Sequence, residues 1–264
     1  MLRPGVATHI LLQSRLEQGF GKRPDDVRKA TAAAAHPKAL FVKTVGRIRA
    51  LVASLRHRRS SAWAGYSDAN TYSEESRAQK AGFVETALGE APPGVVLDLG
   101  CNTGEYSRLA LRHAHHVVAL DGDADSVDAL YLAERGSTKL SPIVSDLHNP
   151  TPAQGWQLRE RAGLLERLKG DFVLALALVH HLRISAGVPL ADAIQFLLDR
   201  APEGIIEWVD REDPMVKQML RLRPDVYPDY TWATFESTLK AHARVLRVSG
   251  AASATRRLCH FSRH

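Results

Sequence analysis

The sequence is short of the features that mark secreted and membrane proteins. Of its 264 residues only Cys101 and Cys259 are cysteines, and two cysteines so far apart give no disulfide framework. The longest apolar run, residues 172–179, is far shorter than the ~20 residues of a membrane helix. The N-terminus lacks a basic start followed by a compact apolar stretch, so a signal peptide is not expected. These absences predict a cytoplasmic protein without a membrane partner.

Acidic residues are scarce in one part of the chain. Residues 1–64 hold 13 Lys and Arg against 3 Asp and Glu, a balance of +10, whereas the remainder holds 22 against 26. This basic quarter is either a docking surface for nucleic acid, an acidic carrier or a partner protein, or a solvated helical face. No aromatic residues interleave with its densest run, Arg56-His-Arg-Arg59, as base stacking would require. The sequence therefore argues against nucleic acid as a partner.

Composition and periodicity divide the chain into three segments. Residues 1–62 predict a basic helical extension, because apolar residues recur there at helical spacings of four and three. These residues are Phe41, Val45, Ile48, Val52 and Leu55. Residues 63–94 are expected to form an aromatic linker and a helix that acts as a lid on the main domain. Residues 95–264 predict the main domain.

In the main domain strand-like runs alternate with helical patterns. The strand-like runs are 95–100, 116–121, 140–146, 171–178 and 204–210, and the helical patterns between them are 105–112, 125–135, 158–168 and 190–200. Apolar runs within them, such as 95–97 and 172–178, do not alternate with polar residues, which is typical of strands buried on both faces of a parallel sheet. A helix at 232–243 and two strands able to pair as an antiparallel hairpin, 244–248 and 256–261, complete the pattern. The predicted fold class is α/β, a doubly wound Rossmann-like sheet of seven strands.

A glycine-bearing turn follows the first of these strands. Asp98 closes the strand, and Gly100 and Gly104 flank a loop that opens a helix. Glycine lets the backbone approach a ligand closely, and the helix start presents free backbone amides. Open α/β sheets bind ligands in the crevice outside the carboxyl ends of their strands. Alone, the turn would serve several cofactors.

Two further acids stand at the ends of the next two strands. Asp121 can accept hydrogen bonds from both hydroxyls of a ribose, as in any adenosine-type ligand. Asp146 can accept from an adenine amino group while Leu147 packs near the ring. Each acid could instead cap a helix, but three acids at three successive strand ends favour an adenosine-type ligand.

A third glycine is missing where a dinucleotide-binding loop has one. Asn102 occupies the second glycine position, and Gly104 follows two residues later. Glu105 adds negative charge at the helix start, which would repel a pyrophosphate. S-adenosylmethionine carries no phosphate but has a cationic sulfonium and an ammonium, so acids around the site suit it as the cofactor.

Taken together, these motifs resemble those of class I S-adenosylmethionine-dependent methyltransferases. The segments 95–107, 117–123, 144–147 and 171–182 resemble the first four motifs of that family. Outside the common core, 146–156, 188–190, 212–215 and 228–231 resemble the bacterial nodulation-protein NoeA-like group, in which the domain often follows a longer N-terminal region. The resemblance covers roughly residues 60 to 264 and is weak in the N-terminal extension.

The resemblance implies a set of cofactor contacts. The residues around the methionine moiety would be Asp98, Gly100, Asn102 and Gly104. Asp121 with Gly122 would bind the ribose, and Asp146 with Leu147 the adenine. Ala177, in the fourth motif, is also counted with the cofactor-binding residues. Tyr72 of the aromatic linker, with Tyr66, would fold over the cofactor as a lid or pack on the domain surface.

Three residues are candidates for catalysis. His180 and His181 lie just past the fourth strand, where either one takes a proton from the nucleophile or the pair only shapes the turn. Glu207 lies in a buried-looking strand, so its carboxylate is either paired structurally or contacts the substrate. No metal is predicted, because the histidines at 113, 115 and 116 do not match a ligand spacing.

The function predicted is methylation of an O, N or C atom of a small or carrier-bound metabolite. An Asn/Asp-Pro-Pro-Tyr tetrapeptide is missing after the fourth strand, which argues against methylation of nucleobase amino groups. One alternative keeps the cofactor but cyclises or cleaves it, with release of methylthioadenosine. Another is a non-catalytic module whose basic N-terminus docks on RNA or another subunit.

Overall fold

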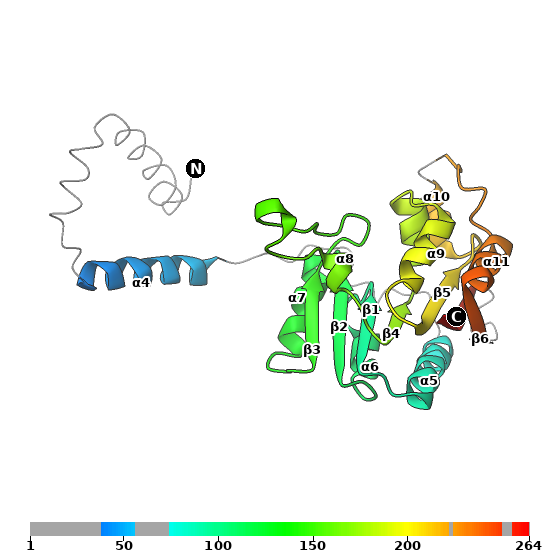
Figure 1. The fold of residues 1–264 in the computed structure, drawn as a ribbon, viewed down its shortest axis with the longest axis horizontal. Helices are drawn as coiled ribbons and strands as arrows, with labels where there is room; N and C mark the ends of the chain where they lie inside the picture. The colour runs from blue at the N-terminus through cyan, green and yellow to red at the C-terminus, as the bar shows by residue number, and fades with distance from the viewer. Residues whose placement is uncertain (1–37, 56–73, 222–223, 250–254, 264) are drawn as a thin grey trace. The chain divides into compact units, whose positions relative to one another are not determined.

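The computed structural model describes residues 38–55, 74–221, 224–249 and 255–263 (Figure 1). The chain divides into two units, residues 1–59 and 60–264. In the first unit the described residues form the helix α4, Lys38–Ser54, as the apolar spacing predicts. The predicted boundary at residue 62 lies outside the described residues, so the division into three segments stays a prediction.

A seven-stranded sheet forms the centre of the second unit, with strand order β3-β2-β1-β4-β5-β7-β6. Its first five strands are parallel: β1 (Val95–Leu99), β2 (His116–Asp121), β3 (Leu140–Val144), β4 (Phe172–Ala175) and β5 (Glu203–Val209). The antiparallel strands are β7 (Arg256–Arg263), which pairs with β5, and β6 (Ala243–Val248), which pairs with β7. The predicted fold class and the terminal antiparallel pair are confirmed.

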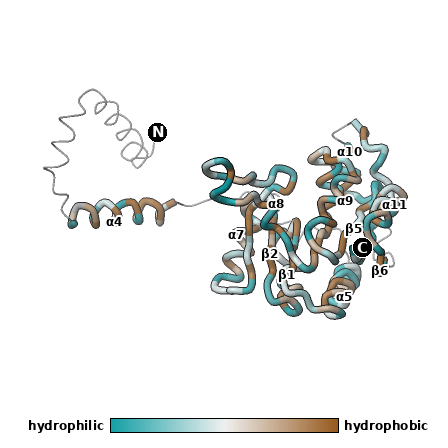
Figure 2. Tube along the Cα trace, in the orientation of Figure 1, coloured by the Kyte–Doolittle hydropathy of each residue, from teal (hydrophilic) through white to brown (hydrophobic). Residues whose placement is uncertain are grey.

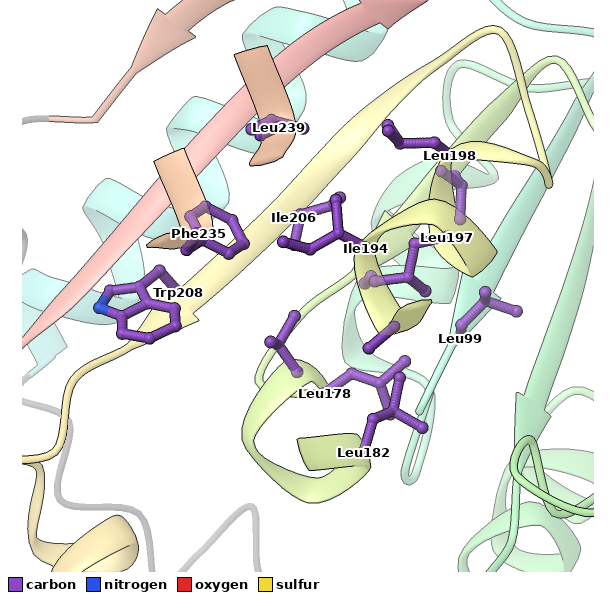
Figure 3. Close-up of a cluster of buried hydrophobic side chains, with 14 of the residues drawn as sticks. Leu99, Leu178, Leu182, Ile194, Leu197, Leu198, Ile206, Trp208, Phe235 and Leu239 are labelled. Carbon is purple, nitrogen blue, oxygen red and sulfur yellow. The ribbon is translucent and has the colours of Figure 1, made fainter. Parts of the chain in front are cut away.

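Helices pack on both faces of this sheet. One apolar core includes side chains of α5 (Glu74–Glu90), α6 (Glu105–Ala110) and α7 (Ala124–Ala133). The other includes side chains of α8 (Leu164–Arg167), α9 (Leu190–Leu198) and α11 (Trp232–His242). Figure 3 shows part of the second core, where Ile206 and Trp208 of β5 face α9 and α11.

Successive residues of β1 and β4 point into different cores. In β1, Val96 packs with α5, α6 and α7, whereas Leu97 and Leu99 pack on the opposite side. Both side-chain rows are buried, which explains why the strand sequences do not alternate between apolar and polar. Asp98 shares the face of Val96, so a carboxylate lies in an otherwise apolar row.

The order of the strands reverses at the centre of the sheet. From β1 the chain proceeds outward through β2 and β3, then returns to place β4 on the other side of β1. The carboxyl ends of β1 and β4 therefore diverge, and a crevice forms where their following loops separate. This is the edge at which the sequence places its glycine turn and its three acids.

Two predicted elements differ from the structure. The helix predicted at 158–168 is confirmed only at 164–167, and its first part is wrong. The segment instead forms a turn, η2 (Trp156–Leu158), in which Gln157 and Leu158 have positive φ, and a bridge between Gln154 and Arg161. The helical conformation begins only at α8. The strand predicted at 171–178 ends early, because the chain leaves the sheet after Ala175 and Ala177 has a φ of 51°.

Two elements were not predicted. A π-helix, η3 (His181–Ser185), follows β4 directly, and α10 (Pro214–Arg221) follows β5. The start of α10 has a recognisable signal in the sequence. Asp213 accepts a hydrogen bond from the backbone amide of Met215 through Oδ1, and Pro214 occupies the first helical position.

The sheet leaves no room for a side chain at Gly204. A Cβ there would lie 2.4 Å from the carbonyl oxygen of Val173 on the neighbouring strand, whereas a Cβ at Gly82 of α5 would meet nothing within 4 Å. We expect Gly204→Ala to lower the free energy of unfolding by about 1–3 kcal/mol, and Gly82→Ala to raise it by up to ~1 kcal/mol. Urea denaturation of both variants measures the difference. Equal effects of the two substitutions would contradict the strand packing described above.

Candidate cofactor and active site

A cavity of about 680 Å³ opens at the carboxyl ends of the parallel strands. Its walls come from the loops that follow β1, β2, β3 and β4, together with α5 and β7. The predicted site residues that line it are Asp98, Gly100, Asn102, Asp121, Gly122, Asp146, Leu147, Ala177 and His181. The structure thus brings together residues that are spread over more than eighty positions of the sequence.

The loop after β1 is held in an unusual backbone conformation. Gly100, Asn102 and Gly104 all have positive φ, at 79°, 48° and 81°. Asn tolerates this region better than other non-glycine residues, so Asn102 replaces a glycine at little cost. Gly104 cannot be replaced in the same way, since a Cβ would lie 2.3 Å from a methyl carbon of Leu130. Gly104 is therefore a packing residue at the start of α6 and does not line the cavity.

Asp121 connects this loop to the end of β2. Its Oδ2 accepts a hydrogen bond from the backbone amide of Asn102 and its Oδ1 from that of Asp123, both at 2.8 Å. Burial raises the pKa of Asp121 above its ordinary value, and these two amides oppose that rise. The carboxylate is thus fixed in orientation at the cavity wall.

Asp146 follows β3 and is paired with a histidine that the sequence analysis did not single out. Its Oδ1 lies 2.5 Å from Nδ1 of His148 and accepts the His148 backbone amide at 3.1 Å. Leu147 and His148 also line the cavity. The pairing holds the Asp146 carboxylate at the rim, where its side chain is about half exposed.

Asp98 is the most buried acid of the cavity. Its Oδ2 accepts a hydrogen bond of 2.5 Å from the hydroxyl of Ser107. Burial raises the pKa of Asp98 to about 6, and the charge of Asp121 adds to that effect, whereas the Ser107 hydrogen bond and the charge of Lys80 oppose it. A cationic ligand beside Asp98 would favour its ionised form.

The two predicted histidines have different surroundings. His181 lines the cavity, whereas His180 is fully buried, and in the described part of the chain neither of its ring nitrogens has a hydrogen-bond partner. Their ring centroids lie 4.2 Å apart. Burial lowers the pKa of His181 to about 4, aided by the positive charge of Arg256, and burial lowers the pKa of His180 well below its ordinary value. Both imidazoles are therefore uncharged at neutral pH.

Glu207 stands behind the cavity wall. Its Oε2 lies 2.6 Å from Nζ of Lys80, and its Oε1 lies 3.8 Å from a guanidinium nitrogen of Arg256. Arg256 in turn forms a two-pronged pair with Asp213, at 2.8 and 3.2 Å. These four charged side chains, here called the buried ion network, are all at least nine-tenths buried. The structure places Glu207 in this network, and its catalytic role stays a prediction.

Lys80 and Arg256 line the cavity, and the sequence analysis missed both. Lys80 also lies over the ring of Tyr106, 4.9 Å from its centroid. A signal for Lys80 existed: the buried residues of α5 are Lys80, Val84, Ala87 and Leu88, so the lysine shares a helical face with apolar residues. Arg256 had no such signal, because only the pairing of β7 with β5 brings it to the cavity.

Some predictions fall outside what the structure describes. Tyr66 and Tyr72 lie among residues 56–73, which are not described, so the lid stays a prediction. Within the described ranges, three or more His, Cys, Asp or Glu side chains nowhere gather as a metal site would require. The same residues include no helix with the length and apolar character needed to cross a membrane.

At the level of sequence, the chain is similar to a nodulation protein. No family model matches it. The nodulation protein NoeA of Rhizobium meliloti (strain 1021) is 35% identical over 242 residues, which make up 90% of this chain and 51% of NoeA. The chain thus spans about half the length of this relative. The predicted resemblance to the NoeA-like group is confirmed.

At the level of fold, solved methyltransferases are similar to this chain. The N-methyltransferase NodS of Bradyrhizobium japonicum WM9 aligns with a TM-score of 0.52 at 11% identity, over 72% of this chain and 97% of NodS. The 16S rRNA methylase RmtB aligns with a TM-score of 0.50 at 17% identity, over 86% of this chain and 84% of RmtB. Identities this low show the shared fold, which is that of class I methyltransferases.

The lowered pKa of His181 makes stability depend on pH. In the unfolded chain the His181 imidazole binds a proton below its ordinary pKa of 6.5, whereas in the folded chain it does so only below about pH 4. The free energy of unfolding therefore falls as the pH drops from 6.5 to 4. We expect His181 to contribute about 3 kcal/mol of this loss, so that the loss is smaller by that amount in His181→Asn, whereas the part caused by the buried His180 remains. Urea denaturation at several pH values measures it, with exposed His242→Asn as the control. A parallel loss in wild type and His181→Asn would show that the imidazole is not held uncharged.

Proposed function

We propose that this chain, which has the fold of class I methyltransferases and is related to NoeA, transfers a methyl group from S-adenosylmethionine to an acceptor. The observation that carries the proposal is the charge arrangement of the cavity. Acids from three successive strand ends line it, and the cations Lys80 and Arg256 stand in the wall supplied by α5 and β7. This arrangement suits a ligand with both positive and negative groups.

The nucleoside half of the cofactor is expected at β2 and β3. Each oxygen of the Asp121 carboxylate accepts one backbone amide, and a carboxylate oxygen can accept further hydrogen bonds from ribose hydroxyls. Asp146 contacts His148 through Oδ1, so Oδ2 is the oxygen proposed to accept from an adenine amino group. Leu147 would then pack against the ring.

Asp98, Lys80 and the β1 loop supply the groups for the methionine half. Gly100 and Asn102 line the cavity, and the carbonyl oxygens of this loop are the groups proposed to bind the ammonium. Asp98 would balance the positive charge of the ammonium and the sulfonium. Lys80, positioned by Glu207, would balance the carboxylate, so that Glu207 acts by holding Lys80 and does not contact the reacting atoms.

His181 is the residue proposed to receive the acceptor's proton. S-adenosylmethionine supplies a methyl group activated by the sulfonium. The chain has to position the attacking atom and exclude water from it. Leu176, Leu178 and Leu182 supply apolar lining beside His181. An uncharged imidazole at neutral pH can accept a proton from a hydroxyl or amino group as it attacks.

A small or carrier-bound metabolite is the acceptor class that fits these surroundings. A cavity of about 680 Å³ holds a cofactor with limited space beside it. Residues 65–264 carry 22 Lys and Arg against 26 Asp and Glu, so the unit that holds the cavity has a net negative charge. A polyanion such as RNA would be repelled by this unit.

Removal of the Asp121 carboxylate tests the assigned ribose contact. We expect Asp121→Ala to weaken S-adenosylmethionine binding by roughly 100-fold, because hydrogen bonds to a charged group are lost together with the anchor of the Asn102 loop. Isothermal titration calorimetry measures the affinity, and Asp128→Ala, which removes an exposed acid from α7, is the matched control. Unchanged affinity of Asp121→Ala would refute the contact.

Product analysis separates methyl transfer from the other reactions of this cofactor. With extracts of small metabolites as acceptors, we expect S-adenosylhomocysteine to accumulate, and its formation to fall at least tenfold in His181→Asn if the imidazole takes the proton. Chromatography of the nucleoside products makes the measurement. Methylthioadenosine formed without any acceptor would sink the proposal in favour of cyclisation or cleavage.

A further inference from the structure

The helix α4 of the first unit has an apolar face exposed to solvent. Its large apolar side chains are between 42% and 69% exposed, and α4 includes brown segments in Figure 2. They are Phe41, Val45, Ile48, Val52 and, one residue past the helix, Leu55. Their spacings of four, three, four and three residues align them along one side of the helix.

The polar residues of α4 carry charge of one sign. Lys38, Lys43, Arg47 and Arg49 are all exposed, and residues 38–55 include no Asp or Glu. By helical geometry Lys43 and Arg47 lie on the side opposite the apolar face, whereas Lys38 and Arg49 flank it. Long basic side chains beside an apolar face can extend past it and place their charges in the polar layer above.

We propose that α4 docks on an anionic lipid surface, with its apolar face at the boundary between headgroups and acyl chains and its Lys and Arg on lipid phosphates. A helix that combines an apolar face with basic residues is the pattern that binds membrane surfaces. Each basic residue gains from the negative potential of such a surface. Docking of this kind needs no membrane-spanning segment, so it agrees with the lack of a spanning helix among the described residues.

Charge favours lipid over a second copy of this chain. In a paired helix the positions beside the apolar seam set the partner through opposite charges. In α4 those positions are Val42, Thr44, Arg49 and Leu51, so two copies would have no acid with which to pair. The seam also spans only about two heptads, which is short for a stable coiled coil. The phosphates of a nucleic acid would pair with the Lys and Arg side chains but would leave Phe41, Ile48 and Val52 exposed to solvent.

Vesicle co-sedimentation of the full chain tests this assignment. The vesicles are phosphatidylcholine alone, or phosphatidylcholine in which part is replaced by phosphatidylglycerol. We expect partitioning only onto the anionic vesicles, and a decline with added salt. The double variant Lys38→Glu/Arg49→Glu, which reverses the two charges that flank the apolar face, should reduce partitioning by at least tenfold, since each basic residue contributes roughly fivefold and its reversal costs more.

A matched pair of substitutions distinguishes the apolar face from charge alone. Ile48→Asp and Ala50→Asp both add one acid to exposed positions of α4, but Ala50 lies on the side opposite the apolar face. We expect Ile48→Asp to reduce partitioning by about tenfold more than Ala50→Asp. Circular dichroism and calorimetry with S-adenosylmethionine check that folding and cofactor binding are retained, so the test is independent of the proposed methyl transfer.

Three results would overturn the assignment. One is equal partitioning of Ile48→Asp and Ala50→Asp. Another is equal behaviour of neutral and anionic vesicles, including no binding to either. The third is a dimer in buffer, seen by sedimentation velocity, that Ile48→Asp dissociates, because the apolar face would then belong to a second copy.

Discussion

The buried ion network of Lys80, Glu207, Arg256 and Asp213 joins three elements that are distant in sequence or in the sheet order, α5, β5 and β7, to the turn before α10. Lys80 comes from α5, Glu207 from β5, Arg256 from β7, and Asp213 precedes α10. Removal of one partner of a buried pair leaves an uncompensated charge, which typically costs about 3–5 kcal/mol. The network therefore holds α5 against the sheet and fixes the two cations that stand in the cavity wall. The shape and the charge of that wall depend on the same contacts.

The opposite wall is organised by backbone hydrogen bonds. Leu120 accepts the amides of Gly100 and Cys101 through its carbonyl oxygen, and the neighbouring Asp121 carboxylate accepts that of Asn102. The end of β2 thus fixes the loop after β1 in its conformation, in which Gly100, Asn102 and Gly104 have positive φ. A cofactor entering here would meet groups already in place, which limits the entropy lost on binding.

Much of the sheet and of the cofactor edge was predictable because local patterns encode it. Most residues of β1, β2, β4 and β5 are apolar, and Asp98, Asp121 and Asp146 stand at or near the ends of the first three strands. Parallel strands bring such ends to one edge whatever the loops do. The first part of the helix predicted at 158–168 was wrong because that stretch holds a residue with positive φ, Leu158, and a bridge at Arg161, and the helix begins only at Leu164. The spacing of apolar residues in a sequence does not indicate where a residue has positive φ.

By itself, the sequence determined the fold class, the edge of the sheet that holds the cavity, and the acids that line it, because these follow from strand order and from residues a few positions apart. Only the tertiary structure decided which charges stand across the cavity. Lys80 and Arg256 are 176 residues apart and meet because α5 packs beside β7 and β7 pairs with β5. It also separated His181, which lines the cavity, from His180, which is buried next to it. Adjacent residues differ in this way because their side chains leave the backbone in different directions. Only the packing of the folded chain shows which of the two faces the cavity.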